Sequence, residues 1–373
     1  MDAPKGARAE LRDGLRATLV PWLIAHVIVL AVCLRIGGGG IFSPLYAWDT
    51  HWYISEANGM AHGGNVFADF TGAGGLAHFF PLTPLCVAGL ALVTRLPVPF
   101  LMFAFCWALA WLFGALVHVI AMRETRDRLT ASRAAWLSQL APGAFALVMG
   151  YTEPLAGVLA ALYFLAIRRQ RTGWAIVAGL LAGLSRPTGI LLALPGFHEA
   201  VRDARRARWA LRPVLAGLAR TASPAVGLGT YLAYCQWRFG DWILPFSQQV
   251  SSGNRGAVMQ NPFTTIETLL DSPGDEAILV TSLACAVIGI FALTACWGLL
   301  PGSFTAWAAV MFALGITSPL FTSEPRYIAA IVPFLVSLPE LIRSRWVWIP
   351  FLVANLTLMY SVADLAMSLR QIA

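Results

Sequence analysis

Residues 46–84 read YAWDTHWYISEANGMAHGGNVFADFTGAGGLAHFFPLTP and lie between two strongly apolar regions. This polar stretch carries carboxylates and histidines among aromatic side chains, namely Asp49, His51, Glu56, Asp69 and His78. A long polar loop between membrane segments is usually functional rather than a plain connection. We therefore interpret residues 37–97 as a long first outer loop that carries a functional site.

The composition of the chain indicates a membrane protein. Of its 373 residues, 58% are hydrophobic and 12% are charged, whereas an average soluble domain is about 25% charged. Apolar runs of roughly 17 to 25 residues recur along the whole length, as expected of membrane-spanning helices. We predict an all-α polytopic membrane protein with a single domain, residues 1–373, and about 11 membrane segments. No soluble domain of ordinary size fits between these segments.

The net charge of +7 comes from arginines that are segregated along the chain. Basic clusters at 5–16, 123–133, 168–171, 202–212 and 343–345 alternate with apolar runs. Positive residues concentrate in the cytoplasmic loops of membrane proteins, so this pattern favours a membrane topology over nucleic-acid binding. Arginine outnumbers lysine 25 to 1, which is typical of G+C-rich bacterial genomes. We therefore expect a bacterial plasma membrane, or the endoplasmic reticulum for a eukaryotic chain.

Topology traced from these clusters places several short motifs on the same, extracytoplasmic side. They are WD at 48–49, YTE at 151–153, SRP at 185–187, FGD at 239–241 and SEPRY at 323–327. Charged groups near membrane depth are costly and usually functional. The motifs therefore predict one site at the outer membrane face.

Three segments need a specific interpretation in this topology. Basic clusters flank residues 174–197 on both sides, so we predict two short helices that meet at residues 185–187, where Pro187 interrupts the helix. Residues 81–96 are short and are expected to dip into the membrane or lie at its surface. Residues 134–150 are expected to form one outward span.

Asp49 is the leading candidate for a catalytic base. A carboxylate can take the proton from an attacking hydroxyl, and Asp49 lies among Trp48, Trp52 and Tyr53. The alternative role is a helix N-cap, because Asp49 could begin a short helix over residues 50–58. The three aromatic side chains are equally compatible with stacking on a sugar and with a place at the membrane interface.

The other outer polar side chains also have more than one interpretation. Glu153 could act as a second acid, bind a sugar hydroxyl or cap a helix that starts at Pro154. Arg186 and Arg326 could bind a phosphate or form ion pairs with outer carboxylates. The carboxylates available for such pairs are Glu153, Asp241 and Glu324.

The histidines of the outer loop do not form a metal motif. His51, His62 and His78 follow one another at 11 and 16 residues, and together with Asp49 and Asp69 they match no established ligand spacing. Polar packing is the better interpretation, with His78 a candidate for a hydrogen bond to substrate. We expect no cofactor, and the sequence leaves a divalent metal open.

The order of the motifs resembles that of a known family. WDTHWYISEA, AHFFPLTPL, PGAFALVMGYTEPL, GLSRPTGILL, RFGDWILPFSQQ and EPRYIAAIVPF follow one another along the chain. They are similar to motifs of the glycosylphosphatidylinositol mannosyltransferase II family and its bacterial relatives, within the GT-C superfamily of multispanning glycosyltransferases. The resemblance covers residues 10–365. At the positions of Thr83 and Trp242 the family is expected to have Tyr and Pro. These two differences bear on the identity of the acceptor more than on the class of reaction.

The resemblance implies a GT-C-type fold and an inverting transfer of mannose. The donor would be a polyprenyl-phosphate-linked sugar, and the acceptor a lipid-linked molecule or glycan at the extracytoplasmic face. Asp49 would be the base, while Arg186 and Arg326 would bind the donor phosphate. We expect substrate contacts from Trp48, His51, Trp52, Tyr53, His78, Glu153, Asp241, Gln248, Glu324 and Tyr327.

Two other functions stay open on the sequence alone. A transporter or flippase for a lipid-linked sugar would explain arginines at membrane depth, but not the carboxylate-bearing loop. No internal repeat of the kind common in transporters is visible. A catalytically silent subunit of a glycosylation complex would tolerate Asp49→Asn.

Overall fold

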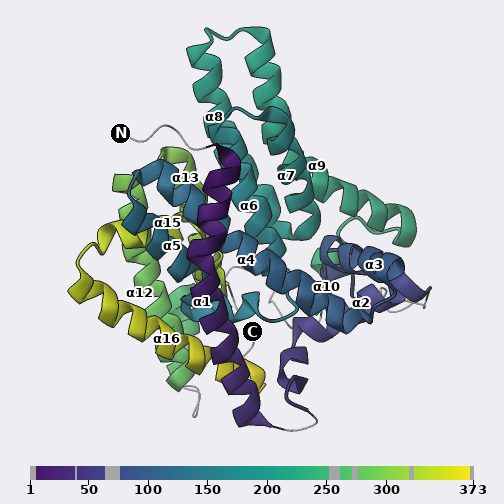
Figure 1. The fold of residues 1–373 in the computed structure, drawn as a ribbon. Helices are drawn as coiled ribbons and strands as arrows, with labels where there is room; N and C mark the ends of the chain where they lie inside the picture. Colours follow the sequence, from purple (N-terminus) through teal and green to yellow (C-terminus); the bar gives the residue numbers. More distant parts are fainter. Residues whose placement is uncertain are drawn as a thin grey trace.

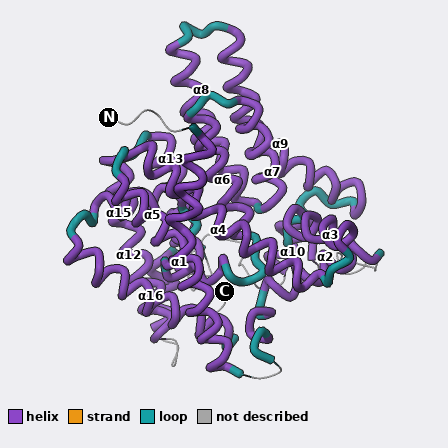
Figure 2. The backbone as a smooth tube through the Cα atoms, viewed as in Figure 1, coloured by secondary structure: helices purple, strands orange, loops and turns teal. Residues whose placement is uncertain are grey.

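The computed structural model describes residues 6–37, 40–63, 76–251, 261–270, 276–318 and 323–369. Within these ranges all regular structure is helical and no strand occurs (Figures 1 and 2). The all-α prediction is therefore confirmed. The helices are α1 (Ala7–Ile36), η1 (Ser43–Tyr46), α2 (Asp49–His62), η2 (Leu76–His78), α3 (Leu82–Thr94), α4 (Val98–Thr125), α5 (Arg128–Leu140), η3 (Pro142–Leu147), α6 (Glu153–Arg168), α7 (Thr172–Ser185), η4 (Pro187–Leu192), α8 (Ala193–Arg206), α9 (Leu211–Phe239), α10 (Leu244–Ser251), α11 (Pro262–Leu270), α12 (Glu276–Leu299), α13 (Gly302–Ile316), α14 (Glu324–Ala329), α15 (Val332–Leu341) and α16 (Arg345–Met367).

The chain is a multi-pass integral membrane protein. In the part that the structure describes, four helices are long and apolar enough to cross a membrane: α1, α4, α12 over Leu279–Leu299, and α16. Shorter apolar helices are α3, α7, α13 and α15. The number of crossings therefore stays a prediction.

Helix α1 packs on other helices with one side and exposes apolar side chains on the other. One side packs closely on α4, where a Cβ added at Gly14 would lie 2.6 Å from the carbonyl oxygen of Ala115. Small residues let membrane helices approach in this way. Large apolar side chains on its outer side are exposed, as expected of a surface that faces lipid: Leu19, Leu23, Val27, Leu30 and Leu34.

Prolines interrupt two of the predicted segments. The predicted break at 185–187 is confirmed, because α7 ends at Ser185 and Arg186 has extended backbone before Pro187. Residues 134–150, which were predicted to form one outward span, do not form one continuous helix. Helix α5 ends at Leu140, because Pro142 disfavours helical backbone at the residue before it, and the chain continues as the 3-10 helix η3.

The predicted outer loop, residues 37–97, is itself largely helical where it is described. Helix α2 covers and extends the short helix expected over 50–58. Helix α3 has 13 residues, so it is about 20 Å long and shorter than the ~30 Å apolar core of a bilayer. Helices α2, α3 and α10 gather on one side of the molecule, while α8 and the start of α9 project from one end (Figure 1).

Candidate active site

The backbone at Trp48 places Asp49 at the start of α2. Trp48 occupies the N-cap position with a φ of 53°, which non-glycine residues rarely adopt. Its indole Nε1 donates a hydrogen bond to the carbonyl oxygen of Ala366 in α16, at 2.8 Å. Asp49 follows as the first helical residue, and 34% of its side chain is exposed.

The carboxylate of Asp49 does not cap the helix. Its described hydrogen bond is with Arg326, whose Nη1 lies 3.2 Å from Oδ2. The N-cap interpretation of Asp49 is therefore wrong by one position, since Trp48 holds that place. The positive end of the helix dipole still stabilises a negative charge at the first residue.

Arg326 connects two carboxylates from inside the protein. Its side chain is only 4% exposed, and its Nε lies 3.3 Å from Oε1 of Glu153. The guanidinium carbon also lies over the rings of Tyr151, at 5.3 Å, and Tyr327, at 5.6 Å. Charged, hydrogen-bonding and aromatic contacts thus surround this buried cation.

Glu153 extends the chain of charges to Arg186. It is the first residue of α6, after Thr152 at the N-cap, and its Oε1 lies 2.6 Å from Nη1 of Arg186. The prediction that Glu153 caps a helix starting at Pro154 is wrong by one position, because Thr152 is the N-cap and Glu153 the first helical residue. Arg186 and Arg326 each form an ion pair with Glu153, as the second interpretation of these arginines predicted.

The resulting order is Asp49, Arg326, Glu153, Arg186, with two negative and two positive groups. The two middle members are buried, while the outer members are 34% and 18% exposed. Buried ion pairs are costly to break because removal of one partner leaves an unpaired charge. An accessible carboxylate and an accessible guanidinium therefore stand at the ends of a fixed, electrically balanced row.

Two buried residues, Tyr151 and Glu56, were not singled out as site residues, although Tyr151 belongs to the YTE motif at 151–153. Tyr151 is fully buried against Arg326, and its hydroxyl has no hydrogen-bond partner in the described chain. Glu56 is fully buried on α2, also without a partner, and burial raises its pKa well above the usual value. Glu56 is seven residues after Asp49, a helical spacing that could have indicated a shared inward face.

Tyr53 lies on the same side of α2, between Asp49 and Glu56. It is 7% exposed, and its ring meets that of Phe79 edge-on at 5.0 Å. Burial, followed by the charge of Asp49, raises the pKa of its hydroxyl. The predicted residue His78 packs beside the same phenylalanine, with ring centroids 4.1 Å apart.

Other predicted site residues lie around this centre or away from it. His51 and Trp52 are exposed on α2, with rings 5.3 Å apart. Asp241 accepts a hydrogen bond from the backbone N–H of Ile243 at 2.9 Å, so it belongs to its own turn rather than to either arginine. Gln248 is buried on α10, which packs against η2.

Glu324 is two residues from Arg326 but is not among the partners of that arginine. It is fully buried, and its carboxyl faces Gly315 of α13, where an added Cβ would lie 2.5 Å from Oε2. The ion pair of Arg186 or Arg326 with Glu324 or Asp241 is absent among the described residues; Glu153 and Asp49 provide the partners instead.

No group of three His, Cys, Asp or Glu side chains that could hold a metal occurs in the described ranges. Asp69, which the sequence grouped with the loop histidines, lies outside the described residues. Asp49 and Glu153 are both engaged by Arg326. The site as described is therefore one of carboxylates and guanidiniums.

No family model matches the sequence, and no curated protein matches it. The structure is similar to that of archaeal oligosaccharyltransferase AglB from Archaeoglobus fulgidus in complex with an inhibitory peptide and a dolichol-phosphate, with a TM-score of 0.46 and 13% identity over 93% of this chain and 56% of that one. For the apo oligosaccharyltransferase of the same organism the TM-score is 0.48, with 13% identity over 94% and 56%. The chain spans about half the length of these proteins. At such identities and TM-scores, the basis for a function lies in the side chains of the site.

Proposed function

We propose that this protein is a membrane glycosyltransferase of the GT-C type. It transfers mannose from a polyprenyl-phosphate-linked donor to a hydroxyl of a lipid-linked or glycan acceptor, with inversion, at the extracytoplasmic face of a bacterial plasma membrane. The observation that carries the proposal is the partly exposed carboxylate of Asp49, held 3.2 Å from the buried guanidinium of Arg326. The motif order that resembles membrane mannosyltransferases supports the choice of sugar and donor.

The two arginines provide the site for the donor phosphate. Arg186 is 18% exposed and Arg326 borders the accessible Asp49. A phosphate diester brings one negative charge to a row that is balanced without it. The phosphate therefore competes with Asp49 and Glu153 for the guanidinium N–H groups, and charge-assisted hydrogen bonds of this kind are strong. Donor binding thus frees the carboxylate of Asp49 as it fills the site.

The transfer step uses the freed carboxylate as a general base. Asp49 takes the proton of the acceptor hydroxyl as its oxygen attacks the anomeric carbon. The bond from this carbon to the phosphate oxygen breaks, and the lipid phosphate leaves with the bonding electrons. Arg186 and Arg326 stabilise the charge that develops on the leaving phosphate. Attack opposite to the leaving group inverts the configuration of the sugar.

Exposed rings beside Asp49 provide a surface for the acceptor. Trp52 is 43% exposed and lies next to His51 on the first turns of α2. The flat apolar face of an indole suits the apolar face of a sugar, and the imidazole offers a hydrogen bond to a hydroxyl. These features support a glycan or glycolipid acceptor over a purely apolar one.

The test uses purified full-length protein in lipid nanodiscs with radiolabelled polyprenyl-phosphate mannose and membrane lipid extract. We expect a labelled glycolipid or glycan and an equal amount of free polyprenyl phosphate. Asp49→Asn should abolish both, whereas Glu267→Gln, at an exposed carboxylate of α11, should not. Movement of intact donor across the bilayer without release of polyprenyl phosphate would contradict the proposal and favour a flippase.

A further inference from the structure

Helix α14, which carries Arg326, fits between two glycines from other elements. Gly143 of η3 lies on one side, and Gly315 of α13 lies on another. Neither glycine has a positive φ, so the backbone conformation does not require glycine at either position. The requirement is space, because a Cβ at either position would overlap α14.

Gly143 contacts the backbone of α14 directly. An added Cβ would lie 2.0 Å from the carbonyl oxygen of Pro325 and 2.5 Å from the backbone nitrogen of Arg326. Backbone atoms cannot rotate away as a flexible side chain can, so a methyl group at residue 143 must displace α14 itself. The displacement acts at the residue whose side chain joins Asp49 to Glu153.

The ion pairs of Arg326 have little tolerance for such a shift. Its nitrogens lie 3.2 Å from the carboxylate of Asp49 and 3.3 Å from that of Glu153. The first distance is at the long end of the hydrogen-bond range, and the second is that of an ion pair without a hydrogen bond. A movement of α14 by a few tenths of an ångström in the wrong direction therefore weakens both contacts.

Gly315 contacts α14 through the side chain of Glu324. Both carboxyl oxygens of this residue are buried and have no hydrogen-bond partner among the described residues. Because residue 315 is glycine, the carboxyl of Glu324 can pack directly against α13. A methyl group at residue 315 would displace the carboxyl of Glu324. Because α14 has only six residues, the displaced carboxyl would disturb the position of Arg326, two residues further on.

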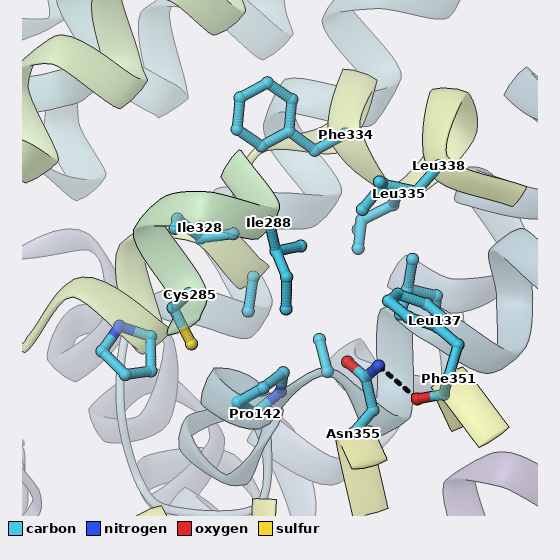
Figure 3. Close-up of a pocket in the computed structure, with 13 residues that line it drawn as sticks. Leu137, Pro142, Cys285, Ile288, Ile328, Phe334, Leu335, Leu338, Phe351 and Asn355 are labelled. Carbon is cyan, nitrogen blue, oxygen red and sulfur yellow. Dashed lines mark hydrogen bonds between the residues drawn. The ribbon is translucent and has the colours of Figure 1, made fainter. Parts of the chain in front are cut away.

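A small apolar cavity of about 20 Å³ borders the same helix (Figure 3). From α14 it is lined by Pro325, Ile328 and Ala329, and from η3 by Pro142. Figure 3 shows Pro142 and Ile328 on its wall, with Asn355 bonded to the carbonyl of Phe351 nearby. The packing around α14 therefore leaves a small void beside this helix and η3.

We propose that Gly143 and Gly315 form a slot that fixes α14 and so directs Arg326 at Asp49 and Glu153. The two glycines are positioning residues: they act on substrate only through Arg326. Their effect on turnover rests on the proposed function, whereas their effect on the placement of α14 does not.

The experiment compares Gly143→Ala and Gly315→Ala with Gly298→Ala, a control on α12 where an added Cβ meets nothing within 4 Å. We expect each slot variant to raise the KM for polyprenyl-phosphate mannose, with kcat/KM reduced about 10- to 100-fold, and the control to match the wild type. Glu324→Asp, which shortens the obstructing side chain, should rescue Gly315→Ala at least partly. It should not rescue Gly143→Ala, whose clash is with backbone.

The same rescue pattern is measured without substrate by thermal unfolding and by hydrogen exchange of residues 323–330. Faster exchange there in both slot variants, reversed by Glu324→Asp only in Gly315→Ala, supports the slot even if the wild type transfers no sugar. Exchange and unfolding equal to those of Gly298→Ala would overturn it. In an active enzyme, unchanged donor KM in both slot variants would also overturn it.

Discussion

The guanidinium of Arg326 lies 3.2 Å from the carboxylate of Asp49, across a separation of 277 residues in the sequence. The arginine is 4% exposed and the aspartate 34%. A cation fixed in the interior therefore orients a carboxylate that solvent can reach. Because Glu153, the other carboxylate of the row, is buried, Asp49 is the carboxylate of the row that solvent reaches.

The first prediction concerns Asp49→Asn, which keeps the shape of the side chain but removes the base. We expect kcat to fall about 100- to 10,000-fold, the range usual for loss of general-base catalysis. Thermal unfolding in detergent should change less than in Glu153→Gln, because Arg326 keeps Glu153 as its partner when Asp49 is neutralised. Activity near that of the wild type would remove Asp49 from the role of base.

The second prediction concerns Glu153→Gln, which removes the carboxylate shared by both arginines. Since Arg326 is buried, the loss leaves a poorly compensated internal charge, and we expect destabilisation of about 3–5 kcal/mol. Chemical unfolding of the purified protein in detergent measures the change. An unfolding free energy equal to that of Asp49→Asn would show that Glu153 does not hold the buried row together.

Topology made much of the site predictable from sequence. Arginine clusters fix which loops share a membrane side, so Asp49, Glu153, Arg186 and Arg326 could be expected to meet without any knowledge of helix packing. The resemblance in motif order suggested the roles that are proposed for these residues. The break at Pro187 was also predictable, because proline acts locally on the backbone.

Features that depend on how helices approach one another were not predictable. The burial of Glu56 follows from the face that α2 turns inward, and the position of Tyr151 follows from the path of η3 beside α14. The interruption at Pro142 was missed because the apolar run around it has the length of a membrane span. Gly315 has no local signal at all, since its neighbour Glu324 comes from a different helix.

The third prediction concerns pH and Glu324. Burial raises the pKa of this carboxyl to about 9 from 4.5, so between these values the folded state holds a proton that the unfolded state has lost. Stability should therefore fall as pH rises from about 5 to 8, by up to about 1.4 kcal/mol per pH unit from this group. Glu324→Gln should reduce that slope in thermal unfolding measured across the same range.

The control for the pH series is Glu267→Gln, at an exposed carboxylate on α11. It should leave the slope as in the wild type. Glu56 is buried and its pKa is raised in the same direction, so Glu56→Gln should reduce the slope too. A wild-type stability that rises between pH 5 and 8, or a Glu324→Gln slope equal to the wild type, would contradict this assignment.

The last prediction separates two tryptophans that flank Asp49. Trp48→Phe removes the hydrogen bond to the carbonyl oxygen of Ala366, which keeps the bond from the backbone N–H of Leu369. We therefore expect a loss of about 0.5–1.5 kcal/mol in unfolding free energy. We also expect a lower kcat, because the backbone before Asp49 is less firmly held. Trp52→Phe should leave unfolding unchanged, since that side chain is 43% exposed, but should raise the KM for the acceptor as stacking area is lost. Unfolding curves and acceptor-dependent kinetics of Trp48→Phe and Trp52→Phe measure these two differences. An equal loss of unfolding free energy in the two variants would mean that Trp48 does not anchor the start of α2.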